Sequence, residues 1–249
     1  MSEGPLGFGA EDDRAAALPP APPAPARQGP LHAGRYGWLL GVVAVVAIAF
    51  VVVNGARTEG PGARGLAPGA RLPPFAAPLV TAGVDCDEPK DPCDANVATR
   101  AGQGSAGSRP ACEVRGPRIL NLCELTERGP LVLAFLATRG GDCADELDRL
   151  GRAARRHPGL QVAAVGIRGD LRELRGIVRR HHWHFPVGWD RDGILANLYG
   201  VAVCPHITYA RWHGRAQSTS LGAASDRELE RRIDAVVTAS ERAGWAPPR

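Results

Sequence analysis

A buried strand that leads directly into a helix with a cysteine in its first turn constrains the fold of this chain most. Residues 130–143 read PLVLAFLATRGGDC, and residues 131–137 form a continuous apolar run, typical of a strand buried on both faces of a sheet. The apolar residues of the following ADELDRLGRAARRH recur at helical spacing, with Asp142 placed as the N-cap. Cys143 then lies where a thiolate gains from the helix dipole, although an inert, half-buried cysteine fits this stretch equally well.

The rest of the second half alternates between strand and helix patterns. Buried or extended strands are predicted over residues 160–167, 185–187, 206–212 and 216–221. Helices are predicted over residues 171–182, over 190–201 and after Ser225, and Asp170 and Ser225 are the expected caps of two of them. This order predicts an α/β domain over residues 126–249, with helices on both faces of a mixed sheet.

The first 78 residues are predicted to contribute nothing to that domain. Residues 1–35 are a Pro/Ala-rich tail that cannot bury enough apolar surface to fold, so disorder is expected. Residues 36–53, YGWLLGVVAVVAIAFVVV, carry no charge and predict a transmembrane helix of ~27 Å. The long, acid-containing segment before them favours an uncleaved anchor over a signal peptide. Residues 54–78 are predicted to be a Gly/Pro linker.

The distribution of the cysteines decides the expected location. All six follow the apolar segment, which suits an oxidising compartment and predicts a single-pass cell-membrane protein with an extracytoplasmic C-terminal part. The few arginines around residues 36–53 lean weakly the other way, and a cytosolic domain with reduced thiols is the alternative.

A cysteine-containing extension is predicted over residues 79–125, ahead of the α/β domain. Its spacing favours two local structural disulfides, Cys86–Cys93 and Cys112–Cys123, although four cysteines allow three pairings. The extension has neither a C-x-x-C motif nor a histidine, so no zinc site is expected there.

Charge and histidine patterns exclude further classes of function. The net charge is +4, and no stretch is both basic and aromatic enough for nucleic-acid binding. The spacing of His181, His182 and His184 predicts a solvated helix end, so neither a metal nor another cofactor is expected. His206, next to a turn, is predicted to be a surface residue.

Two stretches resemble the thioredoxin-like superfamily, and within it the membrane-tethered redoxins. LVLAFLAT is similar to the strand before their active site, and FPVGWDRDGILANLYGVAVCPHITYA is similar to their F-P-V-x-x-D-x-x-G-x-x-x-x-Y-G-V-x-x-x-P-T. This group holds extracytoplasmic disulfide reductases and alkyl-hydroperoxide-reductase-like peroxiredoxins. The resemblance spans residues 117–240, implies a three-layer sandwich with a mixed central sheet, and places Pro205 at the family's cis-proline.

The chain departs from the family at its W-C-x-x-C motif. The aligned residues are RGGDC at 139–143, so the attacking cysteine of the family is replaced by Gly140 and only Cys143 remains. Dithiol chemistry needs a second sulfur to release a mixed disulfide. The resemblance implies that the cis-proline loop brings Cys204 close to Cys143.

Three hypotheses therefore remain open. The first is a thiol–disulfide oxidoreductase that uses Cys143 with Cys204 to act on protein thiols or disulfides. Such an enzyme would also need a redox partner protein. The second is a peroxidase in which Cys143 attacks a peroxide, with Thr138 and Arg139 as its polar neighbours. For either activity, Thr138, Arg139 and Pro205 are the expected residues of the substrate-binding loop. The third is a non-catalytic binding or assembly module. In each case the lipid bilayer is the expected partner of residues 36–53.

Overall fold

The structure is a computed structural model that describes residues 37–57, 64–83, 93–138 and 143–248. The chain divides into two units, Met1–Arg57 and Thr58–Arg249, and each is described by itself.

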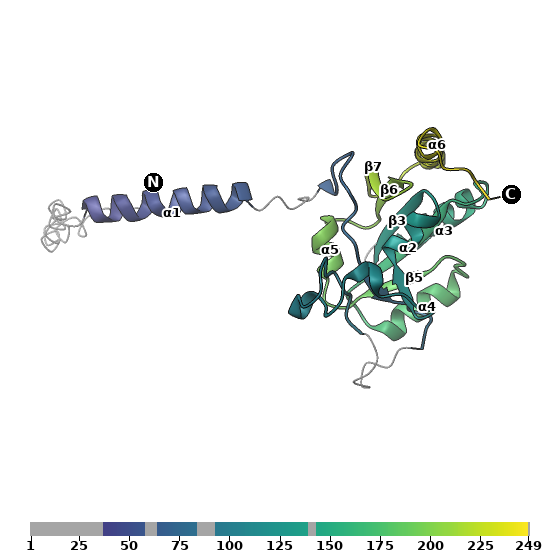
Figure 1. The fold of residues 1–249 in the computed structure, drawn as a ribbon, viewed down its shortest axis with the longest axis horizontal. Coiled ribbons are helices and arrows are strands. Elements are labelled where there is room, and N and C mark those ends of the chain that lie inside the picture. The colour runs from purple at the N-terminus through teal and green to yellow at the C-terminus, as the bar shows by residue number, and fades with distance from the viewer. Residues whose placement is uncertain (1–36, 58–63, 84–92, 139–142, 249) are drawn as a thin grey trace, which may run out of the picture. The chain divides into compact units, whose positions relative to one another are not determined.

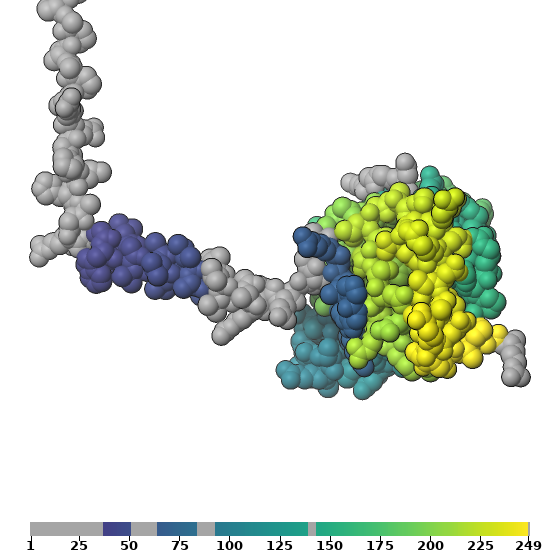
Figure 2. Space-filling model, turned by 90° about the horizontal axis from the view of Figure 1, so that it is seen from above, coloured from purple at the N-terminus to yellow at the C-terminus, as the bar shows by residue number. Residues whose placement is uncertain are grey.

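In the first unit the described residues form one helix, α1 (Gly37–Arg57), drawn in purple in Figure 1, and its residues 37–50 are purple in Figure 2. Its large apolar side chains between residues 38 and 50 are exposed. The predicted helix is therefore present, but among the described residues no helix is long and apolar enough to cross a membrane.

A five-stranded mixed sheet with the order β5-β4-β3-β6-β7 forms the centre of the second unit. Its strands are β3 (Leu131–Ala137), β4 (Gln161–Ile167), β5 (Val187–Asp190), β6 (His206–Arg211) and β7 (Arg215–Leu221). The pairs β3–β4 and β4–β5 are parallel, whereas β3–β6 and β6–β7 are antiparallel. The predicted mixed α/β sheet is thereby confirmed.

Helices cover both faces of this sheet, as Figure 1 shows. They are α2 (Leu122–Arg128), α3 (Cys143–Ala154), α4 (Leu171–Arg180), α5 (Ile194–Tyr199) and α6 (Asp226–Arg242). One apolar core joins α3, α4 and α6 to the sheet through residues such as Leu147, Leu174 and Ile233. The opposite core contains Leu125 of α2 and Tyr199 of α5. The result is the predicted three-layer sandwich.

Local capping follows the sequence signals. The Asp170 side chain accepts hydrogen bonds from the amides of Arg172 and Glu173, and Ser225 accepts one from Glu228. These contacts satisfy amides that the first turn of each helix leaves without partners.

Residues 64–78, predicted to belong to a linker, instead pack against the domain. Leu72 and Phe75 are buried in the core beside α2 and α5, and the Gly69 amide donates to the Ala216 carbonyl at 2.7 Å. This segment continues into β1 (Ala76–Pro78), which pairs with β2 (Ile119–Asn121). The linker prediction was wrong here because a few large apolar residues in a Gly/Pro-rich stretch suffice to anchor it on an open sheet face.

Between β1 and β2, the described residues include two short 3-10 helices. These are η3 (Gly104–Ala106) and η4 (Ala111–Glu113).

Candidate active site

Cys143 and Cys204 form a disulfide. Cys143 is the first residue of α3, and Cys204 lies in the loop before β6, 61 positions later in the chain. Their Cα atoms are 5.7 Å apart, within the ordinary range for a disulfide. The structure thus brings together the two cysteines proposed from the sequence as a working pair.

The two sulfurs differ in their access to solvent. Cys143 is only 2% exposed and belongs to the core beneath α3, whereas Cys204 is partly exposed at the rim of that core. The Ala137 amide, at the end of β3, lies 3.3 Å from the Cys204 sulfur and donates to it. A thiolate arriving from solvent therefore meets Cys204 before Cys143.

The loop that carries Cys204 is fixed on both sides. The Cys204–Pro205 peptide bond is cis, as the resemblance implied, and the Pro205 carbonyl accepts a hydrogen bond from the Gly222 amide at 2.8 Å. Thr138 follows β3 and is half-buried against Gly169, where a Cβ atom would lie 2.3 Å from the Thr138 hydroxyl oxygen. Thr138 thus packs against the loop between β4 and α4. Arg139 lies outside the described residues.

A buried carboxylate lies one helical turn after Cys143. Glu146 is 1% exposed, accepts a hydrogen bond from the Ala224 amide at 3.2 Å and forms an ion pair with Arg149. Arg149 also contacts the Asp226 carboxylate at 3.2 Å. A carboxylate this close in sequence to Cys143 disfavours a Cys143 thiolate unless its charge is compensated. The structure shows that its charge is compensated by Arg149 and that it ties α3 to the start of α6.

His206 is fully buried, so its predicted surface position was wrong. It lies on β6, an interior strand between β3 and β7, and contacts the Phe135 ring edge-on at 5.7 Å. Gly65 covers it so closely that a Cβ there would lie 2.8 Å from the imidazole. Neither ring nitrogen has a hydrogen-bond partner within the described part of the chain, and burial lowers the pKa of His206 to about 4. A neutral His206 supplies no positive charge to the cysteine pair.

Among the described residues, one group of side chains could hold a metal ion, and it contains neither Cys143 nor Cys204. Donor atoms of Asp145, Asp148 and His181 lie within 4.8 Å of one another. Asp148 already accepts hydrogen bonds from Trp183 Nε1 at 2.6 Å and contacts His181 Nδ1 at 2.8 Å. Of the three histidines weighed from the sequence, only His181 belongs to this group.

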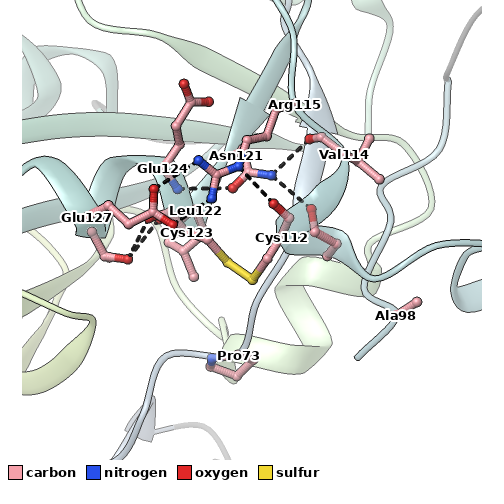
Figure 3. Close-up of a disulfide and its surroundings, with 12 residues drawn as sticks. Pro73, Ala98, Cys112, Val114, Arg115, Asn121, Leu122, Cys123, Glu124 and Glu127 are labelled. Carbon is pink, nitrogen blue, oxygen red and sulfur yellow. Dashed lines mark hydrogen bonds and ion pairs between the residues drawn. A yellow bond between two sulfur atoms is a disulfide. The ribbon is translucent and has the colours of Figure 1, made fainter. Parts of the chain in front are cut away.

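The predicted disulfide Cys112–Cys123 is present, with Cα atoms 5.4 Å apart (Figure 3). It ties η4 to α2, and Asn121 reinforces the link by donating to the carbonyls of Ala111 and Val114. In the chain-entropy model, a disulfide that closes a loop of this size stabilises the fold by ~2–3 kcal/mol. Cys93 is also disulfide-bonded, whereas its predicted partner Cys86 lies outside the described residues.

No protein-family model and no curated protein sequence matches the chain. Solved structures do. A Chlorobium tepidum protein assigned as the thiol:disulfide interchange protein DsbE is similar at 18% identity and a TM-score of 0.52, over 69% of this chain and 99% of that one.

A Bacteroides thetaiotaomicron protein assigned as a protein disulfide isomerase is similar at 12% identity and a TM-score of 0.51, over 73% of this chain and 98% of that one. A hypothetical protein from Sinorhizobium meliloti matches at 17% identity and a TM-score of 0.50, over 70% and 86% of the two chains. Together with the strand order and the cis-proline, these likenesses show that the chain has a thioredoxin-like fold.

Proposed function

Starting from the thioredoxin-like fold, we propose that this protein is a thiol–disulfide oxidoreductase whose redox-active pair is Cys143 and Cys204. The observation that carries the proposal is the disulfide between the cysteine at the start of α3 and the cysteine before the cis-proline. Cys204 takes the place of the cysteine that is missing at position 140, because it supplies the second sulfur that exchange chemistry requires. The neighbours assigned to disulfide interchange and isomerisation have the same fold and are consistent with this chemistry.

The difference in exposure suggests an order of events. A substrate thiolate attacks the Cys204 sulfur, the Cys143–Cys204 bond breaks, and Cys143 leaves as a thiolate at the N-terminus of α3, where the helix dipole stabilises it. The product is a mixed disulfide between the substrate and Cys204. A second substrate thiolate then attacks the substrate sulfur of that bond, so the substrate leaves as a disulfide and Cys204 leaves as a thiolate. The protein gains two electrons, and the reverse sequence reduces a substrate disulfide.

The peroxidase hypothesis is less well supported. A peroxidatic thiol must meet its peroxide directly, and Cys143 is 2% exposed and engaged in a disulfide. Protein thiols or disulfides, together with a redox partner protein, are therefore the proposed partners.

A redox titration tests the proposal. The full chain is equilibrated with defined ratios of reduced to oxidised dithiothreitol, alkylated and analysed by mass spectrometry. We expect the Cys143–Cys204 bond to open while Cys112–Cys123 stays oxidised, because redox-active disulfides have higher reduction potentials than structural ones. If both bonds open together, or only when the protein unfolds, Cys143–Cys204 is structural and the non-catalytic module replaces the enzyme.

We also propose that this domain works outside the cytoplasm. The uncharged residues 36–53 are the proposed contact with the lipid bilayer. The support is the disulfide content, which an oxidising compartment maintains, and the exposed apolar side chains of α1. Protease added to intact cells should then remove the C-terminal domain. Protection of that domain until the cells are permeabilised would place it in the cytoplasm.

A further inference from the structure

A cavity of about 490 Å³ lies at the opposite end of α3 from the disulfide. Its walls come from the second half of α3, the start of β4 and residues 181–186 after α4. Arg152, on its α3 wall, lies nine positions after Cys143, roughly 13 Å along the helix axis. The proposed redox chemistry does not use this space, whose volume suits a small organic molecule.

Aromatic rings in fixed positions form one wall of the cavity. The Trp183 and Phe185 rings are stacked with centroids 5.4 Å apart and planes 22° apart. Trp183 is held by its hydrogen bond to Asp148, and Gly151 leaves room for Phe185, since a Cβ there would lie 3.2 Å from that ring. The wall therefore presents flat apolar surface that needs little ordering on binding.

Two cations without a negative partner lie on the wall that α3 and the turn after it form. Arg152 and Arg155 are one turn apart and exposed, and neither side chain has an ion pair or hydrogen bond within the described part of the chain. Two nearby arginines differ in this respect: Arg149 on α3 pairs with Glu146, and Arg156 after α3 pairs with Glu230.

The single acid among the described residues that line the cavity does not balance these charges. It is Asp148, and its carboxylate already contacts Trp183 and His181. The cavity thus combines an aromatic wall with an excess of positive charge.

We propose that this cavity binds a flat aromatic acid. The ring of the ligand packs against the Trp183–Phe185 stack, and its carboxylate pairs with the guanidinium groups of Arg152 and Arg155. Guanidinium groups bind carboxylates through paired hydrogen bonds, and this charge pairing separates an acid from a neutral ligand of the same shape.

Calorimetric titration of the full chain with 2-naphthoate tests this site, with the uncharged 2-naphthamide as the matched ligand. We expect saturable 1:1 binding of 2-naphthoate with a Kd of about 0.1–1 mM, and binding of 2-naphthamide at least ~10-fold weaker. The double variant Arg152→Gln/Arg155→Gln should weaken naphthoate binding ~10-fold or more. Detergent is kept the same throughout, so that partition of the ligand into micelles cancels.

Arg156→Gln is the control, because Arg156 is next to Arg155 in the turn after α3 but does not line the cavity. This variant should bind 2-naphthoate like the wild type. Equal affinity of the double variant and the wild type, equal affinity for the acid and the amide, or no saturable binding would each overturn the proposal. Cys143→Ser/Cys204→Ser should retain binding, so the outcome is independent of the redox proposal.

Discussion

Cys143→Ser and Cys204→Ser are each expected to abolish the turnover of a disulfide substrate. Each substitution leaves a single sulfur, so the mixed disulfide that forms cannot be resolved within the protein. Turnover of a dye-labelled glutathione disulfide, with dithiothreitol as electron donor, should fall to the uncatalysed rate in both variants.

The two variants should differ in what they trap. Cys143→Ser leaves the partly exposed Cys204 thiol, which should accumulate a mixed disulfide with the substrate. Cys204→Ser leaves only Cys143, which is 2% exposed in the oxidised protein and should trap much less. Non-reducing electrophoresis after acid quenching measures both yields.

The double variant Cys112→Ser/Cys123→Ser is the matched control, since it removes a disulfide of similar Cα separation outside the proposed site. It should be less stable but keep its turnover. Full activity in both single variants, or none in the wild type, would refute the enzyme hypothesis and favour the binding module.

The sequence predicted the regular elements of the domain well because their signals are local. Apolar runs such as residues 131–137 and caps such as Asp170 act within one strand or one helical turn. The proximity of Cys143 and Cys204 was different in kind. It joins residues 61 positions apart, and only the resemblance to a known fold implied it.

The errors concern residues whose environment is set by distant parts of the chain. His206 reads as a strand residue beside a turn, but it is buried because Gly65 and its neighbours cover β6. Glu146 reads as one of several acids on α3, but the Ala224 amide and Arg149 hold its carboxylate in the interior. Helix α2 was missed because its seven residues give little periodicity, although Asn121 is a recognisable N-cap.

The burial of His206 predicts that acid weakens the fold. Its pKa is about 4 in the folded protein and about 6.5 when unfolded, so between these values the unfolded chain binds a proton that the folded chain does not. The contribution of the neutral His206 to the free energy of unfolding is therefore fully present above pH 6.5. It is lost as the pH falls towards 4, by up to about 3 kcal/mol.

Comparison of His206→Gln with the wild type isolates this effect, because glutamine cannot take up the proton. Urea unfolding from pH 7 to pH 4.5 should show a steep loss of stability in the wild type and a shallower one in His206→Gln, whatever the difference between them at pH 7. The comparison is needed because burial raises the pKa of Asp190, which acts in the opposite direction as a folded carboxyl that holds its proton. His184→Gln, which removes an exposed histidine, should follow the wild type. Parallel pH profiles for the wild type and His206→Gln would mean that His206 takes up its proton without unfolding the protein.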